Sequence, residues 1–360
     1  MRRTAALIVG GGPAGSAAAL ALARAGVEAE LVERSEGPHD TVCGGFLGWD
    51  ALAALERLGL DPAALGARRI HRLRLISSAR SIEVALPRAA AGLSRRTLDE
   101  ALLEAARRAG ARVGRGRAVR AADLAERRIR LDEDEALAGD VLLLATGKHE
   151  LRGAARPVDI STRPLGLRCS IAPGPALAEA LEGVIELHLY DGGYAGLLLQ
   201  EDGRANFCLS ASRGRLKQAG GIEPLVARLA DELPAFAERL GQGEAGAWSA
   251  VSGVPYGWRA SETVDGVYRI GDQAAVIASL AGDGIAIALE SGMAAARAIA
   301  AGTAAADYQR DWARRARRPV GLAEMLRQSA EHAPSRQAMM GLLGWFPSLA
   351  PLAASLTRIG

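Results

Sequence analysis

The feature that most constrains this chain is a glycine-rich turn close to its start. An apolar run at residues 4–9 ends at Gly10, and an alanine- and leucine-rich stretch follows the turn up to Arg24. Gly10, Gly12 and Gly15 form a GxGxxG pattern: the first permits a tight turn, the second lets a pyrophosphate approach the backbone, and the third lets a helix pack on a strand. The pattern therefore predicts a strand, a dinucleotide-binding turn and a helix whose N-terminus attracts phosphate.

A second apolar run, residues 28–32, ends on Glu33. Strand, glycine turn, helix and strand in this order predict a βαβ unit and hence a parallel sheet. Glu33 lies 18 residues after Gly15, where a carboxylate at the end of the second strand can accept ribose hydroxyls. The cofactor-binding residues predicted from this unit are Gly10, Gly12, Pro13, Ala14, Gly15, Glu33 and Arg34.

Farther along the chain, the patterns predict two interleaved domains in an α/β fold. Expected framework elements are a helix at 97–109, a buried strand at 140–145, a late strand at 268–271 and a helix at 285–301. Short alternating runs between about 165 and 210, such as 184–189 and 205–209, predict an inserted antiparallel sheet. We expect a cofactor domain at 1–70, 95–160 and 260–302, a substrate domain at 71–94 and 161–259, and helices at 303–360 interrupted at Pro319, Pro334, Pro347 and Pro351.

Composition excludes several other classes of protein. The 360 residues are 49% hydrophobic and 24% charged, which excludes a disordered or collagen-like chain. A net charge of +3 gives no reason to expect a nucleic-acid partner. Cys43, Cys169 and Cys208 lack CxxC or zinc-ligand spacing, so we expect no disulfide framework, no metal site and a cytoplasmic location.

A second glycine motif determines which dinucleotide we expect. Gly271-Asp272 is followed by Gly282-Asp283-Gly284 and an apolar helix. This arrangement resembles the flavoproteins related to p-hydroxybenzoate hydroxylase and the geranylgeranyl reductases. The resemblance implies a glutathione-reductase-type FAD-binding domain, with Asp272 at the ribityl chain and Gly282, Gly284 and Ile285 near the isoalloxazine ring.

Two further segments are similar to the same family. Arg95 begins an element that resembles Arg-x-x-Leu-Asp-x-x-Leu, whose arginine reaches the FAD pyrophosphate. Thr146-Gly147 resembles the strand end that passes the adenosine half, and Val119 is expected beside adenine. The resemblance covers about residues 5–300 and implies FAD as the cofactor, with NAD(P)H as a possible transient reductant, because no second GxGxxG follows a strand.

Residues Cys43-Gly44-Gly45-Phe46 resemble the Cys-Gly-Gly stretch that geranylgeranyl reductase relatives place close to the flavin. The resemblance implies Gly44 as a cofactor contact and Cys43 as a proton donor or a residue that shapes the pocket; a small residue in a crowded turn is the alternative. The segment from Tyr190 to Gly196 resembles the part that these reductases place over the flavin. Tyr194 is therefore the second candidate proton donor, although a tyrosine at a hairpin turn is as often structural.

The expected substrate site is aromatic and apolar. Its candidate residues are Phe46, Trp49, Tyr190, Tyr256, Trp258 and Ser279. Ser279 departs from the family, which usually has a proline there, close to the reactive carbon of the flavin. This departure weakens the expectation of oxygen chemistry, so the leading prediction is hydride transfer from reduced flavin to a C=C bond of a prenyl or polyketide-like substrate. A monooxygenase acting on an aromatic compound and a non-catalytic FAD-binding protein are the alternatives.

The C-terminal region combines arginines at 310–318 with a charge-free run from Ala338 to Thr357. Prolines at 347 and 351 break any membrane-spanning helix. Peripheral membrane contact is one interpretation, and helices packed over the substrate domain with solvated arginines are the other. The oligomeric state stays open.

Overall fold

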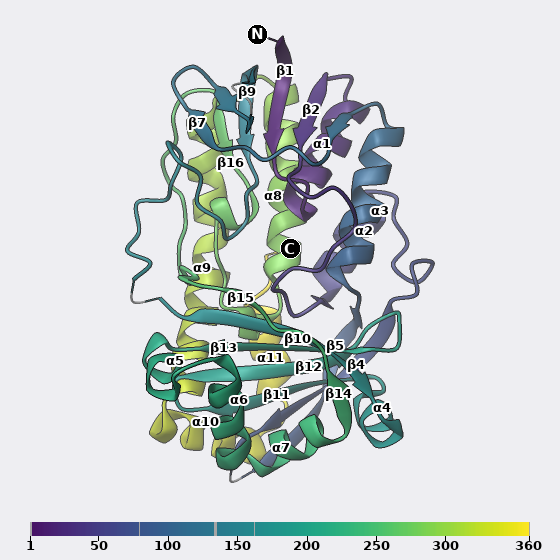
Figure 1. Cartoon of the computed structure of the whole chain (residues 1–360), viewed down its shortest axis with the longest axis vertical. Coiled ribbons are helices and arrows are strands. Elements are labelled where there is room, and N and C mark those ends of the chain that lie inside the picture. The colour runs from purple at the N-terminus through teal and green to yellow at the C-terminus, as the bar shows by residue number, and fades with distance from the viewer. Residues whose placement is uncertain (1, 79, 133–134, 162, 360) are drawn as a thin grey trace.

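The computed structural model describes residues 2–78, 80–132, 135–161 and 163–359, and it contains two large β-sheets. One sheet and its helices lie above the other in Figure 1, and the long helix α9 runs along both. The chain passes between the two sheets several times, because the second sheet is built from segments inserted between strands of the first. The α/β fold with an inserted second sheet, predicted from the sequence, is confirmed.

The first sheet is mainly parallel. Its order is β6 (Arg112–Gly114), β2 (Ala29–Val32), β1 (Arg2–Val9) and β9 (Ala136–Leu144), with β8 (Arg128–Arg130) and β7 (Ala121–Asp123) beyond. The late strand β16 (Val267–Arg269) pairs in parallel with the second half of β9, while β8 pairs antiparallel with its first half. All the parallel strands therefore end at the same edge of the sheet, which is the position where α/β folds bind their ligands.

Small residues allow the helices of this part to pack closely. The main helices are α1 (Pro13–Arg24), α2 (Trp49–Arg57), α3 (Arg95–Arg108) and α8 (Gly284–Ala300). A Cβ atom at Gly292 of α8 would collide with the carbonyl oxygen of Ala14 at the start of α1. The two helices whose N-termini follow the glycine motifs are consequently held against each other.

The second sheet is antiparallel except at one pair of strands. Its order is β14 (Gly243–Ala245), β10 (Leu165–Pro173), β13 (Ala205–Ala211), β12 (Gly193–Leu199), β11 (Val184–Tyr190), β4 (Arg68–Ile76), β5 (Ser81–Gly92) and β3 (Phe46–Leu47), and β15 (Ser249–Val251) also pairs with β10. The strands predicted between about 165 and 210 pair antiparallel as expected, whereas β4, from an earlier segment, joins them through a parallel pairing with β11.

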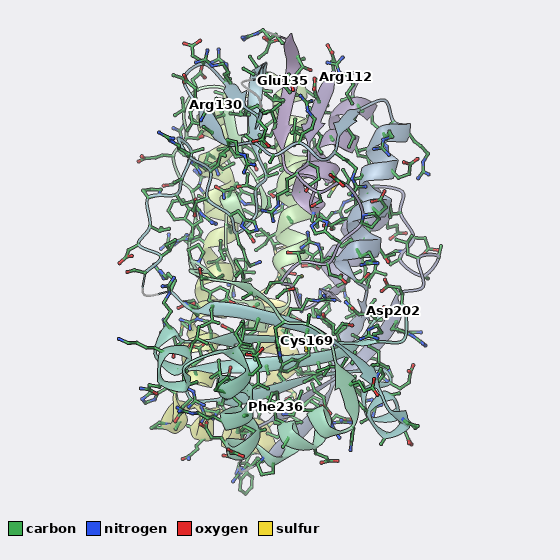
Figure 2. The ribbon with its side chains drawn as sticks, in the orientation of Figure 1. Arg112, Arg130, Glu135, Cys169, Asp202 and Phe236 are labelled. Carbon is green, nitrogen blue, oxygen red and sulfur yellow. The ribbon has the colours of Figure 1, made fainter. Side chains whose placement is uncertain are left out.

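Helices cover both faces of the second sheet. One face packs on α4 (Pro175–Leu181), α5 (Arg213–Ala219), α6 (Ile222–Glu232) and α7 (Pro234–Gly241). Phe236 of α7 lies on this side (Figure 2), and its ring centroid is 5.3 Å from that of Phe207. The other face packs on α9 (Ala305–Glu331), α10 (Ala333–Trp345) and α11 (Leu349–Leu356).

The C-terminal helices differ from expectation at one proline. Pro319 does not interrupt the helix. It lies buried inside α9, and the buried face of α9 around Ala316 and Val320 continues past it. Within the described residues, no single helix is long and apolar enough to cross a membrane. Only α10 and α11 taken together have the length and composition, and they are bent by 118° at a short break.

Candidate active site

A cavity of about 540 Å³ lies where the carboxyl ends of the parallel strands face the second sheet. Residues that follow β1, β2, β6, β9 and β16 all line it, and so do Gly166, Cys208 and Leu209 of the second sheet. Both glycine motifs and the Cys43 segment therefore face one space.

The first glycine turn has the geometry that a pyrophosphate requires. Gly10 has φ +107°, and a Cβ atom at Gly15 would collide with the carbonyl oxygen of Gly10. Gly12 precedes α1, whose N-terminus has no side-chain cap, so the N–H groups of its first turn are available to an anion. Glu33 supports the turn, because its Oε2 accepts a hydrogen bond of 2.6 Å from the backbone N–H of Gly11.

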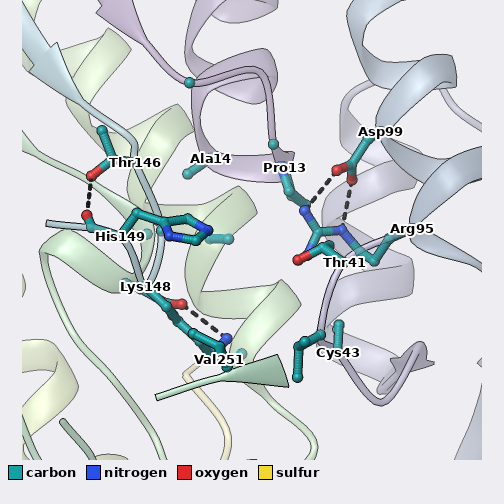
Figure 3. Close-up of a pocket in the computed structure, with 18 of the residues that line it drawn as sticks. Pro13, Ala14, Thr41, Cys43, Arg95, Asp99, Thr146, Lys148, His149 and Val251 are labelled. Carbon is teal, nitrogen blue, oxygen red and sulfur yellow. Dashed lines mark hydrogen bonds and ion pairs between the residues drawn. The ribbon is translucent and has the colours of Figure 1, made fainter. Parts of the chain in front are cut away.

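Arg95 approaches the same turn from α3. Its Nη2 atom lies 3.2 Å from the point where a Cβ of Gly12 would be. Asp99, one helical turn later, accepts hydrogen bonds of 2.7 Å from Nε and 2.6 Å from Nη2 of Arg95 (Figure 3). Burial raises the pKa of Asp99, while Arg95 acts in the opposite direction. The pair holds a guanidinium group beside the glycine turn.

Lys148 enters the cavity from the opposite side (Figure 3). Its Nζ lies 3.1 Å from Oδ2 of Asp272, and this carboxylate is the main cause of the raised pKa of Lys148. Arg156 fixes the two loops to each other, since it donates to the backbone oxygens of Lys148 (3.1 Å) and Asp272 (2.9 Å). Gln273 adds a hydrogen bond of 3.0 Å to the oxygen of Gly147. The loops that follow β9 and β16 thus form one connected unit.

The N-terminus of α8 opens into the cavity through Gly284 and Ile285. Gly282 adopts a left-handed conformation with φ +70°, and its Cα faces the ring of Phe46. Asp283 points away from the cavity into the protein, where it pairs with Arg358 (3.0 Å) and accepts from the backbone N–H of Ile359 (2.9 Å). Burial raises the pKa of Asp283 to about 7, although Arg358 opposes this shift.

Two buried polar residues of the second sheet hold the Cys43 segment. Asn206 of β13 donates hydrogen bonds to the backbone oxygens of Cys43 (3.0 Å) and Gly44 (2.7 Å). Arg168 of β10 in turn donates to Oδ1 of Asn206 (2.7 Å). Cys208 also lines the cavity, and burial raises the pKa of its thiol to about 12.

Three hydroxyl groups meet at Ser279. Its Oγ lies 2.7 Å from the phenol oxygen of Tyr256 and also hydrogen-bonds the phenol of Tyr194. The backbone N–H of Leu280 donates to the same oxygen of Tyr194 (3.0 Å). Tyr256 and Ser279 line the cavity, whereas Tyr194 lies behind them. Burial and the adjacent Tyr256 raise the pKa of Tyr194 well above its usual value.

The structure brings most of the predicted site residues together. Those that line the cavity are Gly10, Gly12, Pro13, Ala14, Glu33, Arg34, Cys43, Gly44, Phe46, Arg95, Val119, Thr146, Gly147, Tyr256, Asp272, Ser279, Gly282, Gly284 and Ile285. Gly15 lies just beneath the cavity, where it serves helix packing.

Besides Gly15, four predicted site residues do not line the cavity. Tyr194 is separated from it by Ser279. Tyr190 lies in the core on the other face of the second sheet, where its hydroxyl donates to the oxygen of Ser210 (2.7 Å). The guanidinium of Arg358 stacks over Trp49, with its Cζ atom 4.3 Å from the centroid of the Trp49 ring. The indole N–H of Trp258 donates to the backbone oxygen of Gln273 (3.2 Å). The expectation that Tyr190, Trp49 and Trp258 face the substrate is therefore corrected.

Several cavity and support residues were missed by the sequence reasoning. Lys148 follows directly after Thr146-Gly147, and Asp99 follows Arg95 by four residues. Both could therefore have been predicted from their spacing to a neighbouring motif. Arg168, Asn206 and Cys208 had none, because only the pairing of β10 with β13 brings them under the Cys43 segment.

The residues of the cavity fit FAD. A Cβ at Gly12 would fill the space beside Arg95, which a pyrophosphate requires to be open. The donor set suits an elongated dinucleotide: free helical N–H groups and a guanidinium for phosphates, and the carboxylates of Glu33 and Asp272 for sugar hydroxyls. A second helix N-terminus, that of α8, faces the far end of the same cavity.

Comparison with known proteins leads to the same cofactor. Residues 3–135 match the family model described as FAD binding domain. Menaquinone reductase of Mycolicibacterium smegmatis is 28% identical over 324 residues, which cover 85% of this chain and 78% of that protein.

Two solved structures share the fold. P. aeruginosa PqsL in complex with 2-aminobenzoylacetate is 21% identical with a TM-score of 0.72, covering 95% of this chain and 100% of that one. A geranylgeranyl bacteriochlorophyll reductase-like protein from Thermoplasma acidophilum is 19% identical with a TM-score of 0.70, covering 92% of this chain and 85% of that one. The chain is a FAD-dependent oxidoreductase whose residues 3–135 match the FAD-binding domain.

Proposed function

We propose that this oxidoreductase reduces a C=C bond in an apolar substrate of the prenyl type. The relative named menaquinone reductase supports the substrate class, since a menaquinone carries a prenyl chain, and that likeness extends over most of both proteins. The observation that carries the proposal is the cluster of hydroxyl groups at Ser279, which provides proton donors beside an apolar wall.

The wall opposite the glycine turn is suited to a hydrocarbon. Val251, Val254 and Ile277 line it, and aliphatic surface of this kind favours an apolar ligand by about 25 cal/mol per Å² buried. The polar groups of the cavity include the hydroxyls of Tyr256 and Ser279 and the thiols of Cys43 and Cys208, and the ammonium of Lys148 is paired with Asp272. Such a wall accommodates a double bond together with a donor for its proton.

Adding two hydrogens across a double bond needs a hydride at one carbon and a proton at the other. Bound FAD in its reduced form supplies the hydride, and NAD(P)H is the proposed source of its electrons. In this proposal Tyr256 donates the proton from the cavity wall, and Ser279 holds the Tyr256 hydroxyl in place. Tyr194 acts through Ser279, because its high pKa keeps its phenol protonated. Cys43 is a second donor at the cavity wall.

The test is anaerobic turnover of a short-chain menaquinone by the reduced, FAD-loaded protein. We expect a product that has gained two hydrogen atoms and keeps them when air is admitted. A product that returns to the starting mass in air would assign the reaction to the quinone ring and contradict the proposal.

The variant Tyr256→Phe tests whether the hydroxyl of Tyr256 is the proton donor. We expect it to lower the rate of product formation by about 100-fold, the usual contribution of a general acid, with FAD content unchanged. Tyr190→Phe is the matched control, because Tyr190 is a buried phenol on the face of the second sheet opposite to that of Tyr194, and its rate should stay within about twofold. Equal rates for the Tyr256 variant and the control would remove Tyr256 from the mechanism.

A monooxygenase is the second candidate. Phe46 and Tyr256 place aromatic rings at the cavity, and the structurally similar PqsL was solved with the aromatic compound 2-aminobenzoylacetate. Incorporation of one oxygen atom into an aromatic compound, in place of two hydrogens into a prenyl chain, would select this candidate.

A further inference from the structure

An exposed apolar surface lies at the junction of α10 and α11. Every residue from Gly344 to Ser348 is exposed, including Trp345 at 82% and Phe346 at 58% of their full exposure. Leu342 of α10 (51%) and Leu352 of α11 (54%), on either side of this break, are exposed as well. We call Leu342, Trp345, Phe346 and Leu352 the apolar tip. Large apolar side chains gathered in this way mark an interaction surface.

The chain around the tip carries no charge for 21 residues. Residues 337–357 contain no Asp, Glu, Lys or Arg, and an ion pair closes each end of this run. Arg336 pairs with Asp191 at the start, and Arg358 pairs with Asp283 at the end, each at 3.0 Å. The apolar tip is consequently fixed to the body of the protein by both of its flanks.

A cation, Arg80, lies beside the tip. Its Nη1 lies 3.6 Å from the point where a Cβ of Gly344 would be, and the side chain is exposed. Arg80 has no ion pair among the residues that the structure describes. The acidic residues that adjoin the charge-free run in sequence, Glu324 and Glu331, are both paired with Arg327. The surroundings of the tip therefore favour an anionic partner.

The geometry matches the surface of a bilayer. The 118° bend between α10 and α11 directs both helices back toward the protein, so that Trp345 and Phe346 are at the break. Aromatic side chains of this kind prefer the boundary between lipid headgroups and acyl chains, and arginine near that boundary is attracted to anionic headgroups.

The buried side of the same helices reaches the active site. Met340, Leu343 and Ala350 pack in one cluster with Tyr194, against which Leu280 also packs. Ser279, the neighbour of Leu280, lines the cavity. A single layer of side chains thus connects the apolar tip with the hydroxyl cluster.

We propose that the apolar tip docks this enzyme on an anionic lipid surface, from which it takes its substrate. The inference rests on the proposed function for the kind of substrate, because a prenyl compound resides in a bilayer. The docking itself follows from the exposure of the tip, its charge-free flanks and Arg80.

Flotation of the FAD-loaded protein with vesicles tests the docking. The vesicles contain phosphatidylcholine with phosphatidylglycerol, or phosphatidylcholine alone. We expect the wild type to float with the anionic vesicles and the double variant Trp345→Ser/Phe346→Ser to bind at least tenfold more weakly. The matched control is Ile160→Ser/Val264→Ser, which removes two exposed apolar side chains outside the tip and should float as the wild type does. Arg80→Gln should weaken binding to the anionic vesicles only.

Equal flotation of the tip variant and the wild type, or no flotation of the wild type, would overturn the inference. A third result would also overturn it: the wild type does not bind the vesicles but forms a dimer in solution, and the tip variant does not form that dimer. In that case a second copy of the chain would cover the tip. Turnover of a detergent-dispersed menaquinone keeps the two claims separate: the tip variant should retain it. Loss of flotation with retained turnover supports docking, whereas absence of that turnover in the wild type refutes the proposed function alone.

Discussion

At the scale of single residues, the site depends on polar groups that each have a second partner. Asp272 faces the cavity and also pairs with Lys148, and Arg95 faces the glycine turn and also pairs with Asp99. The second partner fixes the geometry of the first, so a ligand that binds these groups meets an arranged set of charges. Their substitution should therefore affect the binding of FAD before it affects stability.

Asp272→Ala and Gly12→Val should each lose bound FAD. The first removes a carboxylate of the cavity, and the second fills the space beside Arg95. We expect a weakening of at least about tenfold, equivalent to the loss of one charge-assisted hydrogen bond, in a fluorescence titration of the apoprotein with FAD. Asp265→Ala, at an exposed position just before β16, is the control. Full flavin occupancy in either site variant would mean that the cofactor site is misplaced.

Asp99→Asn should weaken FAD binding without changing any residue expected to touch the cofactor. Asparagine keeps the size of the side chain but leaves Arg95 without its counter-charge and with one fewer acceptor. We expect a dissociation constant roughly tenfold higher. Glu104→Gln, which removes an exposed carboxylate from the same helix, should leave the constant unchanged, and identical constants for the two variants would contradict a positioning role for Asp99.

Some positions of single residues could be predicted from the sequence and others could not. The glycine motifs, Glu33, Arg95 and Asp272 were predictable, because each is placed by a local turn or helix. Tyr190 and Tyr194 were not separable, although they lie on opposite faces of the second sheet. Leu189 pairs with Tyr194 across the hairpin and shares its face, and Tyr190 is the next residue, so the register of one turn decides which tyrosine approaches Ser279.

At the scale of elements, the end of the chain is fastened to the start of α8. Asp283, directly before α8, accepts from Arg358 and Ile359, and Arg315 of α9 donates to the backbone oxygen of Ile359 (3.0 Å). Pro319 in α9 shows the same dominance of tertiary packing. A proline inside a helix costs about 3 kcal/mol, but the buried face of α9 outweighs this preference, which no local pattern could reveal.

The stability of this attachment should depend on pH through Asp283. Its pKa of about 7 in the folded state lies above the value of 3.8 for an unperturbed aspartate, so the folded protein holds a proton that the unfolded chain has released. The free energy of unfolding should therefore fall as pH rises toward and through about 7.

Asp283→Asn should remove this dependence. Denaturant unfolding at roughly pH 5 and pH 8 measures the free energy of unfolding of both proteins. Relative to the wild type, the free energy of unfolding of the variant should increase by an amount on the order of 2 kcal/mol as the pH rises. Asp311→Asn, an exposed position on α9, serves as the control. Parallel pH profiles for the wild type and Asp283→Asn would contradict the raised pKa.

At the scale of the whole molecule, the two sheets place a dinucleotide site and an apolar, hydroxyl-bearing wall on opposite sides of one cavity. The sequence predicts the first of these well, because its motifs are local and follow in order along the chain. The second depends on contacts among β10, β12, β13 and the loop before α8, which are distant in sequence. For this reason the cofactor was predictable and the supports of the reacting groups were not.

We propose that the reduced protein transfers hydrogen to a prenyl double bond rather than activating oxygen. Rapid-mixing absorbance of the chemically reduced, FAD-loaded protein distinguishes the two, first against oxygen and then, without oxygen, against a polyprenyl compound that has no quinone ring, because a quinone ring could itself reoxidise the flavin. We expect slow reoxidation by oxygen with no transient adduct, and rapid anaerobic reoxidation by the polyprenyl compound. A flavin–oxygen adduct whose lifetime increases with an aromatic ligand, together with no reoxidation by polyprenyl compounds, would contradict the account and identify a monooxygenase.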